Sequence, residues 1–175
     1  MKTIPTLLIV AGFACSSGSN PQSHQTRIVC SAPYYGMGNG DGVLDRRCFR
    51  LQSRLSVAAI RGDVAKIRNL LRRGANASSY AGDYLPPLFG ASAEGHTTAV
   101  RLLLDNGAEM NHRYTLRGTP LFAAVYGHHA GVVALLISRG VDVNLRNGND
   151  TCLKIAQANG FTDIVAILKN AGAKE

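Results

Sequence analysis

The stretch GTPLFAAVYGHHAGVVALLISRGVDVN, residues 118–144, has the pattern of two short helices joined by a turn. Pro120 suits the first turn of a helix, where its missing N–H group costs no hydrogen bond. Gly140 suits the left-handed residue that often follows a helix end. Each helix carries an apolar face. The residues of these faces are Leu121, Ala124 and Val125 in the first helix, and Val132, Val133, Leu135, Leu136 and Ile137 in the second. Neither helix is long enough to be stable alone in water.

The same pattern recurs along the chain at a nearly fixed interval. Two sets of equivalent residues are spaced by 33: Leu55, Leu88 and Leu121, and Gly74, Gly107 and Gly140. A fourth copy, from Thr151 to Ala173, follows at a slightly shorter step, because one residue is missing from the connection before it. Repeats at such an interval predict a stack of helix pairs in which each pair buries its apolar face on its neighbours.

These repeats resemble ankyrin repeats, and the resemblance covers roughly residues 51–173. The family's helix-opening Thr-Pro-Leu-His corresponds here to Thr119-Pro120-Leu121-Phe122, Pro86-Pro87-Leu88-Phe89 and Thr151-Cys152-Leu153-Lys154, with the His absent each time. The Gly-His turn is kept in one repeat and altered in the others, as Gly95-His96, Gly127-His128-His129, Gly62-Asp63 and Gly160-Phe161. His128-His129 is interpreted as the same turn with an extra His. The resemblance implies an all-α ankyrin-repeat solenoid of about four helix-turn-helix repeats with finger loops.

The sequence divides into three regions. Residues 1–14 are predicted to be a signal peptide, residues 15–50 a tether and N-terminal loop region, and residues 51–175 the repeat domain. We place the repeats at about 51–80, 81–113, 114–146 and 147–175.

The predicted signal peptide is a short apolar segment that follows Lys2. It is too short to span a bilayer, which needs roughly 20 residues, but it suits a secretory signal. Its end, Gly12-Phe13-Ala14-Cys15, resembles a bacterial lipoprotein signal, and this resemblance implies lipidation of Cys15. Ordinary cleavage after Ala14 is the main alternative, and a buried N-terminal helix is a further one. The expected location is the periplasm, or the outer membrane as a lipoprotein.

Export would place the four cysteines in an oxidising compartment. If Cys15 is lipidated, Cys30 and Cys48 are the natural disulfide pair. Closing the Gly-rich loop between them would contribute about 3 kcal/mol in the chain-entropy model. Cys152 stands at a helix start and is expected to be a small packed residue, since a catalytic thiol would need a basic partner.

Metal binding and catalysis have little support in the sequence. Residues 39–45 partly match a calcium loop, but the first and last ligand positions hold Met37 and Cys48. A turn rich in Gly and Asn explains the same residues. The sequence has no His pair spaced for zinc hydrolysis, no nucleophile elbow and no phosphate-binding loop. We therefore predict no enzyme, no catalytic residue, no metal and no cofactor, and keep a calcium- or metal-binding accessory to an envelope enzyme as the alternative function.

The net charge is +8, and the pI is about 9.7. Much of the positive charge lies in the first repeat and its lead-in, at Arg46, Arg47, Arg50, Arg54, Arg61, Lys66, Arg68, Arg72 and Arg73. A solvated face on a terminal repeat explains this cluster. The alternative is a patch for an acidic protein or an anionic membrane surface. Nucleic acid is not predicted, because no aromatic platform or known binding module accompanies the charge.

The resemblance implies that a partner protein binds the concave face, which finger loops and the exposed ends of the first helices form. The finger positions include Tyr80, Asp83, Tyr84, Arg113, Tyr114, Leu116, Arg117, Arg146 and Asn149, and the helix ends are Ile60, Arg61, Ala93, Glu94, Tyr126 and Asn159. Tyr and Arg often anchor interfaces. The predicted partner-binding residues are Tyr80, Tyr84, Arg113, Tyr114, Arg117, Tyr126 and Arg146. We expect a monomer that scaffolds, protects or inhibits its partner; finger loops that are merely exposed remain the alternative.

Overall fold

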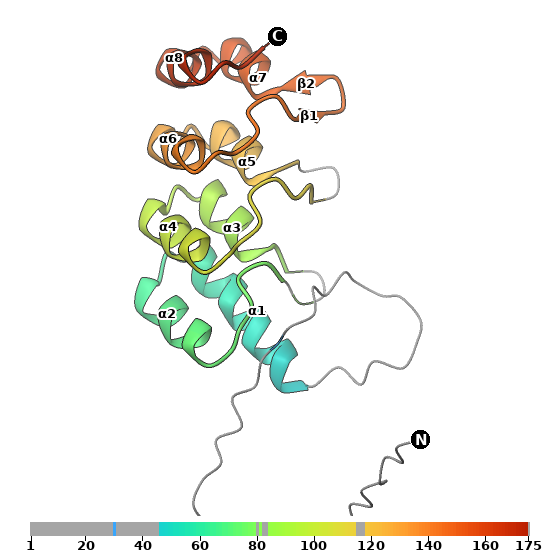
Figure 1. Ribbon diagram of the computed structural model, residues 1–175, viewed down its shortest axis with the longest axis vertical. Coiled ribbons are helices and arrows are strands. Elements are labelled where there is room, and N and C mark those ends of the chain that lie inside the picture. The colour runs from blue at the N-terminus through green and yellow to red at the C-terminus, as the bar shows by residue number, and fades with distance from the viewer. Residues whose placement is uncertain (1–29, 31–45, 80, 82–83, 115–117, 175) are drawn as a thin grey trace, which may run out of the picture.

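The structure is a computed structural model, which describes residues 30, 46–79, 81, 84–114 and 118–174. Four helix pairs follow one another along the chain and stack in that order (Figure 1). The pairs are α1 (Arg46–Ile60) with α2 (Val64–Arg72), α3 (Pro87–Ala93) with α4 (Thr97–Asp105), α5 (Pro120–Tyr126) with α6 (Ala130–Ser138), and α7 (Cys152–Ala158) with α8 (Thr162–Asn170). This arrangement confirms the predicted all-α solenoid of four repeats.

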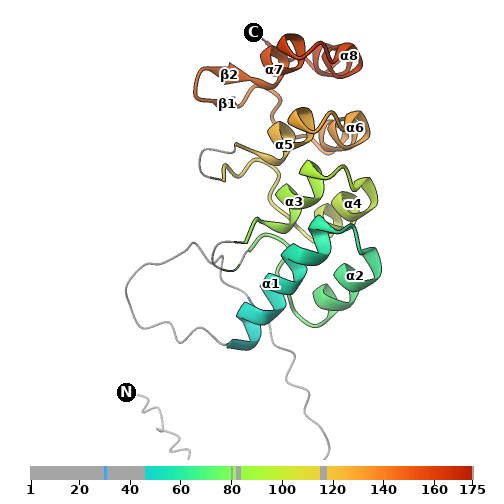
Figure 2. The same cartoon turned by 180° about the vertical axis from the view of Figure 1, so that it is seen from behind.

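The helices form two rows. The first helices of the pairs, α1, α3, α5 and α7, make an inner row, and α2, α4, α6 and α8 make an outer row (Figures 1 and 2). The described parts of the connections between pairs project as fingers on the side of the inner row. One finger is a hairpin, in which β1 (Arg146–Asn147) pairs antiparallel with β2 (Asp150–Thr151). The inner row and the fingers together line one face of the stack.

The helix boundaries follow the local sequence signals. Helix α5 begins at Pro120, with Thr119 as its N-cap. After α6 the chain turns at Gly140, whose φ of 83° lies in the left-handed region that glycine tolerates best. Gly107 does the same after α4, with a φ of 82°. The predicted helix start and both predicted helix ends are therefore confirmed.

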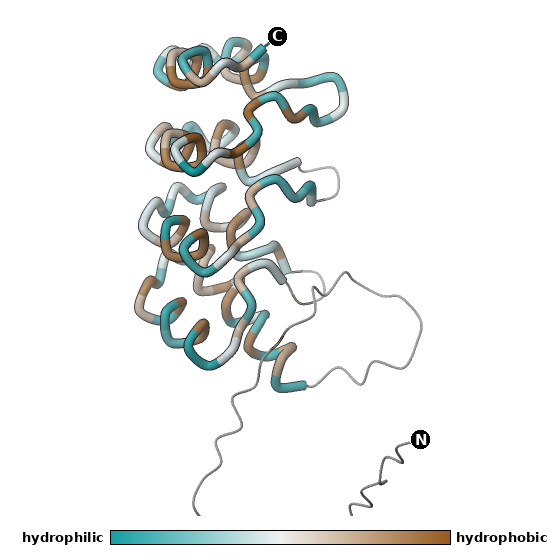
Figure 3. Tube along the Cα trace, viewed as in Figure 1, coloured by the Kyte–Doolittle hydropathy of each residue, from teal (hydrophilic) through white to brown (hydrophobic). Residues whose placement is uncertain are grey.

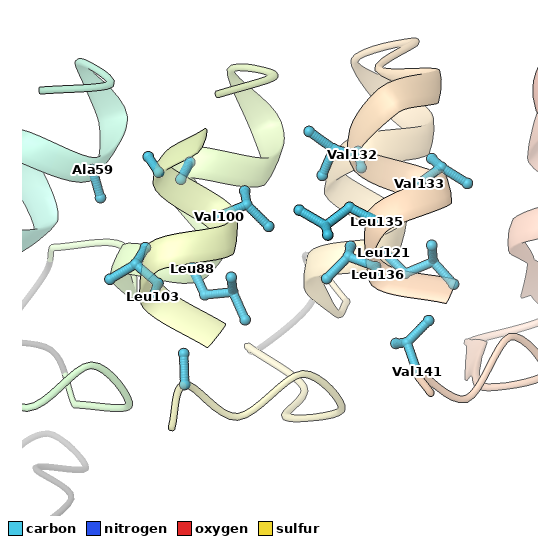
Figure 4. Packing of buried hydrophobic residues seen from close by; sticks show 14 of the residues in the cluster. Ala59, Leu88, Val100, Leu103, Leu121, Val132, Val133, Leu135, Leu136 and Val141 are labelled. Atoms are coloured by element: carbon cyan, nitrogen blue, oxygen red, sulfur yellow. The ribbon is translucent and has the colours of Figure 1, made fainter. Parts of the chain in front are cut away.

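The apolar faces meet between the two rows. Along most helices, hydrophobic and hydrophilic residues alternate, and α1 begins with hydrophilic residues (Figure 3). Figure 4 shows Val100 and Leu103 of α4 beside Leu88 of α3, and Leu136 of α6 beside Leu121 of α5. All five side chains are at most 1% exposed. Each pair contributes only a few such residues. Together they form one core cluster that is continuous from repeat to repeat.

Polar side chains link each repeat to the next. The Nε2 atom of His96 lies 2.9 Å from the carbonyl oxygen of Ile60, one repeat earlier. His129 makes the equivalent 2.9 Å contact with the carbonyl oxygen of Ala93. These carbonyls end the inner helices α1 and α3, where backbone acceptors lack helical partners. The turn histidines therefore satisfy helix ends and fix the spacing of the repeats.

A second set of links lies at the other end of the outer helices. The Asn111 Oδ1 atom accepts from the backbone N–H of Asp142 at 3.1 Å, and the Asn144 Oδ1 atom accepts from that of Lys174 at 2.8 Å. Ser78, one repeat earlier, accepts from the N–H of Glu109 at 3.2 Å. The common interval of the repeats thus recurs in hydrogen bonds as well as in apolar contacts.

The first repeat starts earlier than predicted. Helix α1 begins at Arg46, whereas the predicted boundary of the repeat domain is residue 51. The reason is that Cys48 packs against the core and Leu51 is 5% exposed, so the apolar face of α1 continues toward its N-terminus. The predicted signal peptide, the lipidation site Cys15 and the loop at 39–45 lie outside the described residues.

Within the described parts of the chain, no helix combines the length and the apolar character needed to cross a bilayer.

Candidate functional site

Two tyrosines of the predicted partner-binding set are strongly exposed. Tyr84 precedes α3 and is 44% exposed, and Tyr126 is the last residue of α5 and is 57% exposed. Two of the predicted arginines, Arg113 and Arg146, are also exposed. A Tyr ring offers a large contact area and a polar tip, and Arg offers a planar cation. Among the described residues of the predicted site, these four side chains are exposed to a partner.

Tyr114 has a different position from the one expected. Its side chain is 6% exposed and packs edge-to-face on Phe89, with ring centroids 5.8 Å apart. The backbone N–H of Tyr114 donates to the carbonyl oxygen of Gly118 at 2.9 Å, which closes the base of the finger. Ala123 completes this small apolar cluster. The expectation of an exposed Tyr114 is therefore wrong, because α3 and α5 offer the ring an apolar surface.

Other predicted finger residues lie outside the described part of the chain, whereas Arg146 lies on the hairpin. Tyr80 and Arg117 lie outside the described residues, as do Asp83 and Leu116. Arg146 stands on β1, where it pairs with Thr151 of β2. The hairpin therefore fixes the backbone of Arg146 while its side chain remains exposed.

The turn between α5 and α6 holds a residue that sequence reasoning misread. His128 has a φ of 56° and is the described non-glycine residue with a positive φ. Its place in the repeat corresponds to Gly95, and His129 corresponds to His96. The turn therefore has no extra residue: His128 takes the place of the glycine. The constant interval between repeats was the signal that could have shown this.

His128 is held in this conformation by the next repeat. Its ring stacks on Phe161, with centroids 4.1 Å apart and an interplanar angle of 9°. Its Nε2 atom lies 3.0 Å from Oδ1 of Asp163. The hydrogen bond from His128, with a smaller contribution from the backbone N–H of Ile164, lowers the pKa of the Asp163 carboxyl. This contact links the third and fourth repeats on the solvent side.

The structure gives Cys152 a packing role. Its side chain is 1% exposed at the start of α7, as predicted for a packed residue. Burial raises the pKa of the thiol to about 12. The thiol is therefore protonated near neutral pH and is a poor nucleophile. Across the residues described here, no three His, Cys, Asp or Glu side chains gather in a way that could hold a metal ion.

The positive charge is concentrated at one end of the stack. Residues 46–79 contain nine basic residues and one acidic residue, so this segment carries a net +8, the same as the whole chain. On α1, Arg46, Arg50 and Arg54 are exposed and spaced by four residues. Like charges at this spacing destabilise a helix by about 0.2–0.5 kcal/mol per pair. The first turn of α1 also has no acidic residue to balance the positive end of the helix dipole.

Cys30 is joined to this repeat by a disulfide. Cys30 and Cys48 form a disulfide, with Cα atoms 5.7 Å apart. The backbone N–H of Cys30 donates to the carbonyl oxygen of Gly74 at 3.2 Å, just after α2. Cys30 therefore contacts the first turn of α1 and the turn that follows α2.

Two comparisons with known proteins bear on this arrangement. A family model described as ankyrin repeats, in three copies, matches residues 55–147 and, in an overlapping match, residues 88–175. These matches cover more than half of the chain and include all four helix pairs in whole or in part. A search of curated proteins finds no match to the chain.

Proposed function

Because this chain belongs to the ankyrin-repeat family, whose repeats are in general protein–protein interaction modules, we propose that it binds a partner protein on its concave face. We use this name for the surface lined by the inner row and the fingers. The observation that carries the proposal is the exposure of Tyr84, which precedes the inner helix α3, and of Tyr126, which ends the inner helix α5, with Arg113 and Arg146 exposed on the fingers. Tyr and Arg are the residue types that most often dominate binding energy.

The proposed mechanism is the presentation of a preformed surface. Histidine and asparagine links hold neighbouring repeats at a fixed spacing. Phe89 and Tyr114 hold the base of a finger. A surface that is ordered before binding loses little conformational entropy when it binds. The partner would therefore meet a rigid face, with no reaction carried out by the chain itself.

We propose further that the chain acts in the cell envelope as a monomer and that binding protects or inhibits its partner. The apolar leader and Cys15 support export with a lipid anchor. A disulfide between Cys30 and Cys48 suits an oxidising compartment. The net charge of +8 favours a partner of opposite charge.

The binding proposal is tested by partner capture and measured affinity. Chemical cross-linking in envelope extracts would supply a partner, and the purified pair would then be compared across variants. Tyr84→Ala with Tyr126→Ala should weaken binding about tenfold or more, because each truncation removes a large contact. Arg113→Glu should also weaken it, whereas Arg101→Glu, on the exposed side of the outer helix α4, has the same charge change and should not. Unchanged affinity in the tyrosine variant would remove the concave face from the proposal.

The location is tested separately. The chain would be expressed with its own leader, and intact mass and membrane fractionation would be measured. A chain that starts at Cys15 with added acyl mass is the expected product. A full-length chain in the cytosol would contradict both the anchor and the oxidising compartment.

A further inference from the structure

The first inner helix is longer than the others. Helix α1 has 15 residues, whereas α3, α5 and α7 have seven each. The register of the repeats aligns the ends of α1, α3 and α5 at Ile60, Ala93 and Tyr126, so the extra length lies at the start of α1. A finger precedes each of the other inner helices. In the first repeat, the early turns of α1 reach to the finger side of the stack instead (Figures 1 and 2).

A row of cations begins in these extra turns and ends at the residue that follows them. Arg46, Arg50 and Arg54 recur every four residues and are all exposed; we call them the arginine face. Successive members are separated by a rise of about 6 Å along the helix. This rise is close to the distance between alternate residues of an extended chain, about 6.6 Å, whose side chains lie on one side.

The arginine face is held on a fixed backbone. Gln52, on the opposite side of these turns, is 4% exposed. Its Nε2 atom donates to the carbonyl oxygens of Asn76 at 2.8 Å and Ser79 at 3.0 Å, and also to the Ser79 hydroxyl. Its Oε1 atom accepts from the backbone N–H of Asn76 at 2.9 Å. The long helix is thus tied to the loop that leads into the first finger, so its arginines are presented without further folding.

The charge pattern of α1 destabilises the α1 helix. Three cations at intervals of four residues repel one another. Arg46 also lies in the first turn of the helix, near the positive end of the helix dipole. Sequences break such local rules mainly where function requires it. An anionic ligand along the arginine face would reverse both unfavourable effects.

We propose that the arginine face binds an extended segment of the partner protein that is rich in Asp and Glu. This inference rests on the proposed function and adds a second contact region at the edge of the concave face. Guanidinium groups pair with carboxylates through two parallel hydrogen bonds, which suits a row of acidic side chains. Protein is favoured over nucleic acid because Phe49, 40% exposed, is the one exposed aromatic ring described on α1, whereas single strands need several stacking rings.

The test uses a fluorescein-labelled peptide of alternating glutamate and serine, with fluorescence anisotropy at low salt. The triple variant Arg46→Glu, Arg50→Glu and Arg54→Glu should bind about tenfold more weakly or worse. A control with the same charge change reverses Lys66, Arg68 and Arg72, which are exposed on α2. The control should lose no more than about threefold, because it changes the general field but not the row.

Further measurements distinguish a loss of binding from a folding defect. They also distinguish failure of this inference from failure of the proposed function. The α1 variant should melt at the same temperature as the native protein or higher, since Glu suits a helix N-terminus. The double variant Tyr84→Ala and Tyr126→Ala should bind the peptide normally. Peptide binding that is unchanged by reversal of the arginine face would overturn this inference. The proposal that the concave face binds a partner would still be tested by the capture experiment.

Three other outcomes would also overturn it. Equal losses in the α1 and α2 variants would show attraction by net charge alone. A stronger dependence on the arginine face for vesicles containing phosphatidylglycerol would assign the face to a membrane. The same result with oligothymidylate would assign it to nucleic acid.

Discussion

At the scale of single residues, His128 shows how a repeat tolerates an unfavourable backbone. A left-handed conformation costs a non-glycine residue about 1–2 kcal/mol. Its φ of 56° is accompanied by stacking on Phe161 and a 3.0 Å contact with Asp163, both from the following repeat. The residue that departs from the glycine pattern therefore gains contacts across the repeat boundary that a glycine could not make.

The Asp163 contact predicts a dependence of stability on pH. Because the hydrogen bond from His128 lowers the pKa of Asp163 in the folded state, its contribution is present above the unfolded pKa of about 3.9. The contribution is lost as pH falls through the lowered folded pKa. Asp163→Asn should therefore melt below the native protein at pH 6, and the two melting temperatures should converge toward pH 2.5.

The control for this prediction removes His128, which is the hydrogen-bond partner of Asp163. In a His128→Gly background, Asp163→Asn should cause a smaller change in melting temperature that depends less on pH. A difference between the native protein and Asp163→Asn that stays constant from pH 6 to pH 2.5 would show that the carboxylate is not the group involved.

At the scale of elements, the sequence predicts helix starts and ends where they depend only on neighbouring residues. Pro120 and Gly140 predicted a helix start and a helix end correctly, because these residues act on their own backbone. Tyr114 could not be placed in this way, since its burial depends on Phe89 in another repeat. The start of α1 was also missed, because Arg46 and Arg47 look like a solvated lead-in. Cys48, packed against the core, was the available clue.

Helix packing between neighbouring repeats predicts opposite effects on stability when two helical glycines are replaced by alanine. A Cβ atom at Gly90, inside α3, would lie 2.6 Å from Cγ1 of Ile60. At Gly131, in α6, the nearest atom would be Thr97 Oγ1 at 3.5 Å, an ordinary contact. Alanine favours a helix by about 0.5–1 kcal/mol over glycine, whereas overpacking costs about 1–3 kcal/mol. Gly90→Ala should therefore destabilise the protein and Gly131→Ala should stabilise it.

Urea unfolding of the two variants checks this pair directly, because both changes add one methyl group to a helix. A second substitution tests the cause. Ile60→Ala should itself be destabilising, but Gly90→Ala should cost less in that background than in the native chain. If Gly90→Ala stabilises the native chain, Ile60 does not limit the approach of α1 and α3.

At the scale of the whole molecule, the solenoid separates charge along its length. The first repeat carries the net +8, whereas the described residues from 81 to 174 contain seven basic and six acidic side chains. In a repeat array each unit contacts only its neighbours. Repulsion within the first repeat therefore weakens that end of the stack without being offset by the distant repeats.

This separation predicts that salt stabilises the protein in the absence of any partner. Raising sodium chloride from about 0.01 M to about 0.1 M shortens the Debye length from about 30 Å to about 10 Å. Repulsion among the arginines and Lys66 of the first repeat is then screened, so the melting temperature should rise. Reversing Arg46, Arg50 and Arg54 to Glu balances most of this charge and should remove most of the rise. Because ordinary surface ion pairs weaken as salt increases, a melting temperature that falls over this range would mean that attraction, not repulsion, dominates the first repeat.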